Sequence, residues 1–295
     1  MYSTRVYMPH INPGLRKEEE IVLALDNKRV DELKQNFRYL LREMFGPLDD
    51  NEVVHANLVG GYQKPDFYIE YKYRRIFVSM KSGGAKIVHQ EKLETFIEFL
   101  KEKGVSKTCI EIFLLHHFGD GTTDGTGEER LSYSELQYRY KDKIRWFNKE
   151  VNVDKDLVAA IIDRCVFTGS QPGNIPADYI YFGDKNYGSI CSREQVRKHI
   201  FRKSWLYMDN LHIGPLQFRP HARLLEKREN EEGRMKVDAW WANLEADISF
   251  ISERYNGWFS TFSLKQSKTS FLLIMPINLF RSSTTGMKFW DRIIS

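Results

Sequence analysis

The chain has 295 residues, of which 42% are hydrophobic and 28% charged, and these proportions exclude a largely disordered protein. Its net charge is only +4, and its three cysteines lie far apart without metal-ligand spacing, which excludes a disulfide framework and a cysteine zinc site. The polar first 20 residues and the absence of an apolar run of about 20 residues predict a cytoplasmic protein with no secretory signal and no membrane span.

Helical and strand patterns alternate over the first part of the chain. The predicted elements are, in chain order, a helix (18–45), a strand (53–59), a hairpin of two strands (67–71 and 76–81, with 72–75 as the turn), an amphipathic helix (91–103) and a buried strand (109–115). This order within about 115 residues predicts an α/β fold.

A loop rich in Gly, Asp and Thr follows at residues 119–127. Beyond it the patterns predict helices at 133–149, 154–166, 192–202 and 244–255, and strands at 177–182, 214–224, 235–241 and 271–277. We therefore expect three parts, which could also form one continuous domain: a core (1–118), a loop and helical region (119–205) and a β-rich C-terminal part (206–295).

Basic residues concentrate in two segments. Residues 193–228 contain nine Lys or Arg against three acidic residues, and residues 130–149 contain six against two. Clustered positive charge in a nearly neutral chain predicts a surface that binds a polyanion. An ordinary solvated helix face is the alternative for each segment.

The hairpin over 67–81 brings charged groups together at one end of a sheet. If residues 72–75 form the turn, Asp66 lies opposite Lys81 on the neighbouring strand. Because side chains alternate along a strand, Phe77, Ser79 and Lys81 share a face with Asp66. A carboxylate and an ammonium group are therefore expected side by side.

Glu91 lies in the first turn of the helix predicted over 91–103, from which its carboxylate can point back toward Asp66. Two carboxylates can bind Mg²⁺, and Lys81 beside them can orient a water molecule and stabilise negative charge. Each residue also has a plain structural interpretation: Asp66 in a turn, Lys81 as a charge on a sheet edge, and Glu91 as a favourable charge at a helix N-terminus.

Pro65-Asp66, a short hairpin and Ser79-x-Lys81 resemble the active-site motif of the PD-(D/E)XK, or restriction-endonuclease-like, nucleases. The resemblance covers roughly residues 20–115. It departs from the family at Ser79, which occupies the place of the second acid. Some restriction enzymes share this S-x-K variant and supply the acid from the following helix, a role that Glu91 fits, with Glu94 and Glu70 as competitors.

The resemblance implies a restriction-endonuclease-like mixed sheet flanked by helices, here with a helical insertion and a β-rich C-terminal part. It also implies a Mg²⁺-dependent DNA endonuclease of the type II restriction kind, acting in restriction or other defence against foreign DNA. Asp66 and Glu91 would hold the metal, Lys81 would assist the attacking water, and Ser79 would contact the phosphate or support the metal ligands. An accessory carboxylate on the first helix would come from Glu18, Glu19 or Glu20, for which a solvated acidic patch is the alternative.

Two further interpretations stay open. A missing acid at residue 79 also fits a catalytically degenerate nuclease fold that binds DNA or assembles with partners, and the third interpretation is an α/β protein unrelated to nucleic acid. One active site of this kind cuts one strand, so a double-strand cutter is expected to be a homodimer. The expected DNA contacts are Lys64, His89, Thr122, Thr123, Arg130, Arg197, Lys198, Arg202 and Lys203.

Overall fold

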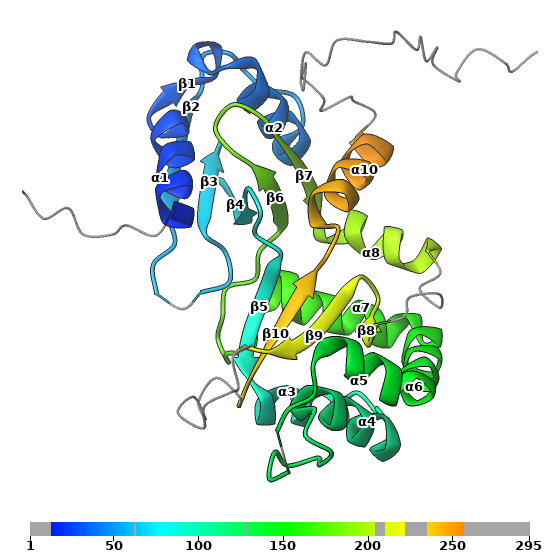
Figure 1. Ribbon diagram of the computed structural model, residues 1–295. Helices are drawn as coiled ribbons and strands as arrows, with labels where there is room; N and C mark the ends of the chain where they lie inside the picture. Colours follow the sequence, from blue (N-terminus) through cyan, green and yellow to red (C-terminus); the bar gives the residue numbers. More distant parts are fainter. Residues whose placement is uncertain (1–12, 62, 128, 204–209, 222–234, 257–295) are drawn as a thin grey trace, which may run out of the picture. The chain divides into compact units, whose positions relative to one another are not determined.

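Two β-sheets organise the part of the chain that the computed structural model describes, which comprises residues 13–61, 63–127, 129–203, 210–221 and 235–256 (Figure 1). These residues lie in one of the two units into which the chain divides, Met1–Phe262. The other unit, Ser263–Ser295, contains the strand predicted at 271–277 and lies outside the described residues.

The first sheet has six strands in the spatial order β1-β2-β3-β4-β6-β7. Their bounds are β1 Lys28–Arg29, β2 Val53–Leu58, β3 Phe67–Tyr71, β4 Arg74–Lys81, β6 Tyr179–Gly183 and β7 Gly188–Ser192. β4 pairs with β6 in parallel, and every other neighbouring pair is antiparallel. The predicted mixed sheet is therefore confirmed, and it draws strands from both sides of residue 118.

The second sheet has four antiparallel strands in the order β5-β10-β9-β8. Their bounds are β5 Ile87–Lys92, β8 His212–Ile213, β9 Leu216–Pro220 and β10 Lys236–Trp241. The sequence predicts β9 and β10 but neither β5 nor its pairing with β10, since that pairing joins segments almost 150 residues apart.

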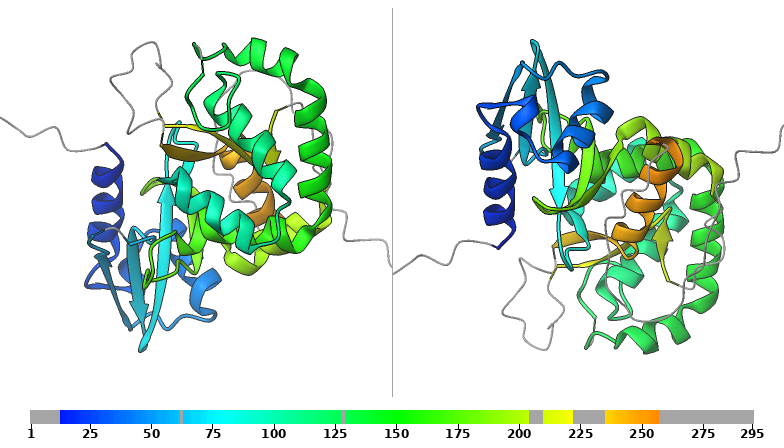
Figure 2. Two further views of the ribbon diagram at one scale, coloured as in Figure 1. Left: turned by 90° about the horizontal axis from the view of Figure 1, so that it is seen from below. Right: turned by 90° about the horizontal axis from the view of Figure 1, so that it is seen from above.

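Helices cover both sheets (Figures 1 and 2). Their bounds are α1 Pro13–Leu25, α2 Gln35–Phe45, α3 Leu93–Glu102, α4 Lys107–Phe118, α5 Tyr133–Arg139, α6 Lys141–Val153, α7 Lys155–Ile162, α8 Arg193–Arg202 and α10 Leu244–Asn256, with a 3₁₀ turn at Val30–Glu32 and a π-helix at Asp163–Thr168. Among the described residues no helix combines the length and the apolar character needed to cross a membrane.

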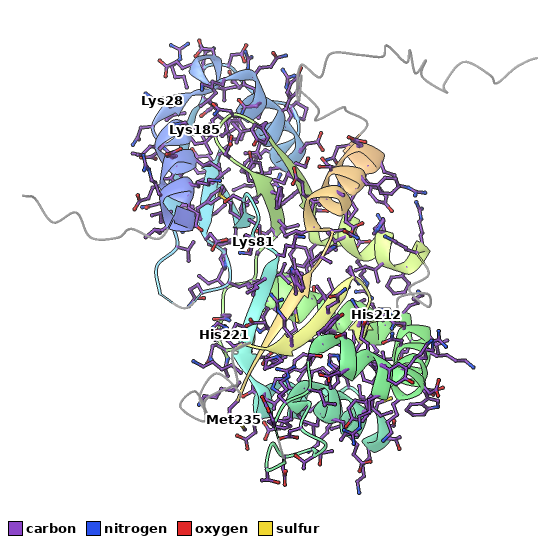
Figure 3. The ribbon with its side chains drawn as sticks, in the orientation of Figure 1. Lys28, Lys81, Lys185, His212, His221 and Met235 are labelled. Atoms are coloured by element: carbon purple, nitrogen blue, oxygen red, sulfur yellow. The ribbon has the colours of Figure 1, made fainter. Side chains whose placement is uncertain are left out.

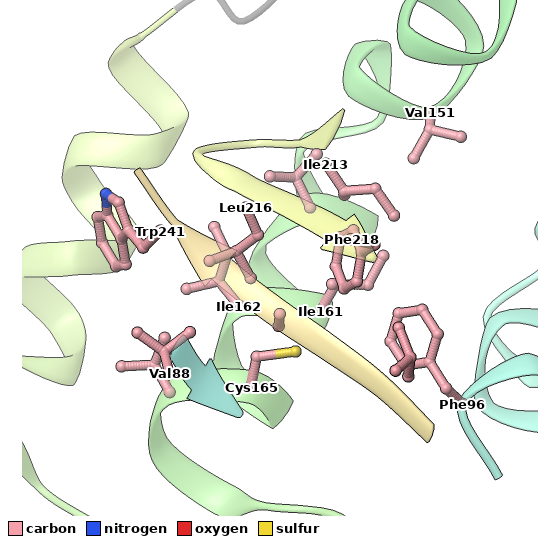
Figure 4. Packing of buried hydrophobic residues seen from close by; sticks show 14 of the residues in the cluster. Val88, Phe96, Val151, Ile161, Ile162, Cys165, Ile213, Leu216, Phe218 and Trp241 are labelled. Carbon is pink, nitrogen blue, oxygen red and sulfur yellow. The ribbon is translucent and has the colours of Figure 1, made fainter. Parts of the chain in front are cut away.

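Two hydrophobic cores lie against opposite faces of the first sheet. Tyr181 packs with the residues of α1, α2 and β2–β4, whereas Ile180 and Phe182 pack into the larger core formed by the second sheet and the remaining helices. Alternate side chains of β6 therefore pack into the two cores on opposite faces of the sheet. Figure 4 shows the larger core, in which the rings of Phe96 and Phe218 stack with centroids 5.0 Å apart.

The predicted helix over 18–45 is wrong as one element. α1 ends at Leu25, Asn27 has a positive φ of 55°, and β1 then pairs with β2 before α2 begins. Asn adopts this left-handed conformation more readily than most residues, so it ends helices.

The buried strand predicted over 109–115 is also wrong, because these residues lie in α4. The Ser106 side chain caps this helix by accepting a hydrogen bond from Cys109 N, and Gly119 ends it with a φ of 64°. A short apolar run has the same appearance in a buried strand and in a buried helix, so periodicity alone could not separate them.

Candidate functional site

The hairpin that carries Asp66 and Lys81 has a two-residue turn rather than the predicted four. Lys72 and Tyr73 have φ angles of 46° and 65°, as a type I′ turn requires, and Phe67 pairs with Val78. Asp66 therefore falls opposite Ser79 and not opposite Lys81. The register is shifted by two residues, and because a shift of two preserves the side-chain faces, Ser79 and Lys81 still share the face of Asp66.

Asp66 is fixed by groups from β4. Its Oδ2 accepts hydrogen bonds from Met80 N at 2.5 Å and Ser79 Oγ at 3.4 Å, and lies 3.8 Å from Lys81 Nζ. Lys81 Nζ also donates to the Met80 carbonyl oxygen at 2.8 Å. The contacts of the Asp66 carboxylate within the described residues all involve Oδ2, which leaves Oδ1 available to a ligand.

The pair lies where the strands of the first sheet end. Lys81 is the last residue of β4 and is in register with Phe182 on the parallel strand β6. Its side chain is 20% exposed and that of Asp66 is 24% exposed, so both can reach solvent. Figure 3 shows Lys81 at the point where the chain leaves the first sheet for the second. In open α/β sheets the carboxyl ends of strands are a common location of ligand sites.

Glu18 on α1 is a third charged group at this place. Burial and the nearby charge of Asp66 raise the pKa of Glu18 to about 7, and Lys81 opposes this effect. Glu18 forms no hydrogen bond or ion pair with the described residues, whereas Glu20 pairs with Arg16 at 3.5 Å and Lys185 at 3.3 Å. Glu18 and Asp66 therefore lie close enough for their charges to interact.

Glu91 has a different environment from the one predicted. It lies in β5, before α3 begins, so its predicted position in the first turn of a helix is wrong. Its side chain is buried, with Oε1 accepting from Arg164 Nε at 2.9 Å and His89 Nε2 at 3.1 Å, and Oε2 accepting from Arg164 Nη2 at 2.6 Å. Both carboxylate oxygens are thus occupied by protein donors.

The two competitors for this role also lie elsewhere. Glu70 accepts two hydrogen bonds from Arg75, at 3.0 and 2.7 Å, at the turn end of the hairpin. Glu94 is exposed in the first turn of α3.

Loss of the Glu91 carboxylate is expected to destabilise the fold. Burial alone would raise the pKa of Glu91, but hydrogen bonds from His89 and Arg164 hold the pKa below its ordinary value of 4.5. Breaking a buried pair costs about 3–5 kcal/mol, so Glu91→Gln should lower the free energy of unfolding by that amount at pH 7. Because the folded-state pKa is depressed, the stabilisation is present above the unfolded-state pKa and is lost as pH falls through the folded-state pKa.

Urea unfolding of the wild type and Glu91→Gln between pH 7 and pH 3 measures this effect. The difference between the two proteins should shrink as the pH falls below 4.5. A difference that does not change with pH would contradict the ion pair as its source.

Two of the predicted DNA contacts point into the protein. Lys64 Nζ donates to the carbonyl oxygens of Val88 at 2.8 Å and Cys165 at 2.5 Å, and burial together with the charge of Lys81 lowers the pKa of Lys64 to about 7. The His89 side chain is 10% exposed and is held by Glu91. The side-chain nitrogen atoms of Lys64 and His89 are therefore held by protein groups, and DNA contact by these two residues stays a prediction.

The remaining predicted DNA contacts lie on the loop before α5 and on α8. Thr122 is bonded within the loop, to Asp120 Oδ1 at 2.8 Å, whereas Thr123 is exposed. On α8 and at its C-terminal end, three basic side chains form ion pairs: Arg197 with Asp156 (3.5 Å), Lys198 with Glu194 (3.6 Å) and Lys203 with Asp247 (3.4 Å). Arg202 lies over the Tyr255 ring. The hollow beside α8 is lined by neither Asp66 nor Lys81, so its contact with DNA stays a prediction.

Asp66 and Glu18 fit a divalent cation better than Asp66 and Glu91 do. Glu18 has no hydrogen-bond or ion-pair partner among the described residues, and burial, with a smaller contribution from the charge of Asp66, raises its pKa. Within those same residues no group of three or more His, Cys, Asp or Glu side chains is placed to hold a metal. In proteins Mg²⁺ commonly binds through one or two carboxylates and completes its shell with water and substrate phosphate.

Comparison with known proteins gives limited information. No family model and no curated protein matches the chain. Among solved structures, the restriction endonuclease MspI in complex with its cognate DNA is similar, with 15% sequence identity over 79% of this chain and 93% of that chain and a TM-score of 0.45. A likeness at this identity and TM-score assigns neither residues nor activity.

Proposed function

We propose that the chain is a Mg²⁺-dependent DNA endonuclease that hydrolyses phosphodiester bonds, in restriction or another defence against foreign DNA. The observation that carries the proposal is the group formed by Asp66, Lys81 and Glu18 at the end of β4. A carboxylate with an available oxygen, a solvent-accessible ammonium and an unpaired carboxylate are the components that metal-assisted phosphodiester hydrolysis needs.

The metal assignment follows from which carboxylate oxygens are already bound by protein donors. Asp66 Oδ1 and Glu18 would hold the ion, and Glu91 would instead keep the surrounding structure in place through Arg164. When bound, Mg²⁺ supplies a Lewis acid for a phosphoryl oxygen and lowers the pKa of a water molecule.

Residues of β4 would stabilise the charge on the phosphate and position the metal ligand Asp66. Lys81 places a positive charge where negative charge develops on the phosphate, and can orient the attacking water. Ser79, 2% exposed, donates to Asp66 and the Met80 amide does the same, so both orient this carboxylate. Ser79 would thus act by holding a metal ligand and not as a ligand itself.

A catalytically inactive DNA-binding protein is the second candidate. It is favoured by Ser79 at the place of the family's second acid and by the full occupation of the Glu91 carboxylate. For an active enzyme that cuts both strands, we propose a homodimer with one site for each strand.

Incubation of the purified chain with plasmid and with phage DNA, in Mg²⁺ or in EDTA, distinguishes the two candidates. An endonuclease converts supercoiled plasmid to nicked or linear DNA in Mg²⁺ and leaves it intact in EDTA. Binding without cleavage of any DNA tested would support the inactive protein instead.

A further inference from the structure

A groove of about 1080 Å³ lies between the loop that leads into α5 and the strands β9 and β10. The indole ring of Trp240 and the amide side chains of Gln217 and Asn243 are among the groups that line it. Flat apolar surfaces combined with amide donors and acceptors suit a nucleobase, which presents a flat face for stacking and a polar edge for hydrogen bonds.

The groove contains a stacked pair that is already formed. The guanidinium of Arg219 on β9 lies 3.9 Å from the centroid of the Trp240 ring on β10, and Lys86 Nζ lies 5.7 Å from the same centroid. Arginine planes and indole rings both stack with bases, and such stacking contributes about 1–3 kcal/mol per base. A base that entered the groove would extend this stack without a rearrangement of its members.

Two polar atoms in the wall of the groove lack hydrogen-bond partners among the described residues. These atoms are His116 Nε2 and Arg219 Nη1. Burial and the charge of Arg130 lower the pKa of His116 to about 3, so the imidazole is neutral at physiological pH. Buried polar atoms without partners are uncommon, and both of these atoms belong to residues that line the groove.

The charged residues of the groove favour a nucleotide over a cationic ligand. Lys86, Arg130 and Arg219 line it together with Glu129 and Glu135. The Glu135 carboxylate accepts a hydrogen bond from Ser132 N at 2.9 Å, in the capping box of α5. Three basic residues against two acidic ones give the lining a net positive charge, which favours an anionic ligand, and one of the two acids is already bound by the helix terminus.

The groove adjoins the residues that follow Lys81. A smaller hollow, lined by Gly83 and Ala85, shares Lys86, Ala242 and Asn243 with the groove. Lys86 is five residues from Lys81, so their Cα atoms are at most about 18 Å apart. At 3.4 Å per base step, this distance corresponds to about five nucleotides of one strand.

We propose that this groove receives one unstacked nucleotide of the DNA strand that occupies the Asp66 and Lys81 site. The inference rests on the proposed function for the identity of the ligand as DNA. Taking a base out of the duplex costs a few kcal/mol, and the cost is smallest for a base that has no pairing partner. The protein should therefore prefer DNA that contains an orphan base.

Fluorescence anisotropy with the full chain carrying Lys81→Ala tests the proposal without cleavage. The probes are a matched 30-base-pair duplex, the same duplex with one adenine opposite an abasic site, and a duplex with two abasic sites opposite each other. The third probe matches the flexibility of the second but lacks the base. We expect binding to the orphan adenine at least about tenfold tighter than to either other duplex, since tenfold corresponds to about 1.4 kcal/mol of the unpairing cost.

Arg219→Ala and Trp240→Ala should each reduce this preference to less than about threefold, and Trp240→Phe should retain it because a stacking face remains. Trp146→Ala, at a 39% exposed position on α6 outside the groove, is the matched control and should leave the preference intact. Circular dichroism identifies any variant that fails to fold. If Trp240→Ala does not fold, Arg219→Ala alone tests the contribution of the stacked pair.

Equal binding to the orphan-base and matched duplexes would overturn the inference and leave the proposed function standing. A preference for the orphan base that persists in both Arg219→Ala and Trp240→Ala would also overturn the inference and leave the proposed function standing. Equal tightening by the double-abasic duplex would show recognition of flexible DNA and would also overturn it. Failure to bind any DNA would contradict the inference and the proposed function together.

Discussion

Asp66→Asn and Lys81→Ala should each lower the rate of Mg²⁺-dependent DNA cleavage by about 10³-fold or more. The first replaces the carboxylate whose Oδ1 is available to the metal, and the second removes the ammonium 3.8 Å from Asp66 Oδ2. Removal of a single preorganised electrostatic group costs about 10²–10³ in rate in other hydrolases, and loss of a metal ligand adds to this. Single-turnover cleavage of plasmid DNA measures both effects.

Lys72→Ala is the matched control for Lys81→Ala. Lys72 lies in the turn of the same hairpin, with a side chain that is 44% exposed, so its removal tests for a general effect of lost positive charge. Its cleavage rate should stay within about threefold of wild type, in line with the small effects of surface substitutions. Equal loss in Lys72→Ala and Lys81→Ala would contradict a special role for Lys81.

Glu18→Gln and Glu91→Gln should affect the protein in different ways. Glu18→Gln should lower the cleavage rate by at least about tenfold and raise the Mg²⁺ concentration needed for half-maximal activity, because it removes one of two proposed metal ligands. Glu91→Gln should leave that Mg²⁺ concentration unchanged while lowering the stability, because its carboxylate is bound by Arg164 and His89. A Mg²⁺ titration of the cleavage rate, with unfolding curves for each variant, separates the two effects.

Glu19→Gln is the control for the neighbouring acids on α1. It removes the same charge one residue away and should change the Mg²⁺ dependence little. If Glu91→Gln and not Glu18→Gln raised the Mg²⁺ requirement, the metal assignment made from the resemblance would be right and the assignment made from the structure wrong.

The faces of the hairpin could be predicted from the sequence, but its register could not. Alternation places Ser79 and Lys81 on one face of their strand, the assumed pairing adds Asp66 to that face, and the structure has all three there. Turn length decides which residues pair. Type I′ turns favour Asn-Gly and similar pairs, so Lys72 and Tyr73 do not predict one from the sequence. The prediction that the three side chains share a face is correct because the register error was an even number of residues.

The environment of Glu91 could not be predicted, because it depends on contacts that are distant in the sequence. Glu91 pairs with Val237 in the second sheet and its carboxylate binds Arg164, so neither partner is visible in the local pattern. The local signal, an apolar periodicity over 91–103, is real but begins at Leu93. Helix boundaries are the least certain feature of such a pattern when a strand precedes it directly.

The proposed role of Glu18 as a metal ligand could be predicted only in part from the sequence. Three successive glutamates on a helix point in different directions, and which of them faces Asp66 depends on how α1 packs against β2. Position on the helix thus predicted a group of candidates, and tertiary packing selected one member of it.

Cleavage of supercoiled plasmid by wild type and by Lys81→Ala, purified in parallel and assayed in Mg²⁺ and in EDTA, tests the central claim most directly. Parallel purification ensures that a contaminating nuclease would be present in both preparations. The proposed site predicts nicked or linear plasmid with wild type in Mg²⁺ alone, and intact plasmid in the other three reactions. Intact plasmid in all four reactions, or equal cleavage by both proteins, would contradict the claim that Asp66, Glu18 and Lys81 form a metal-dependent nuclease site.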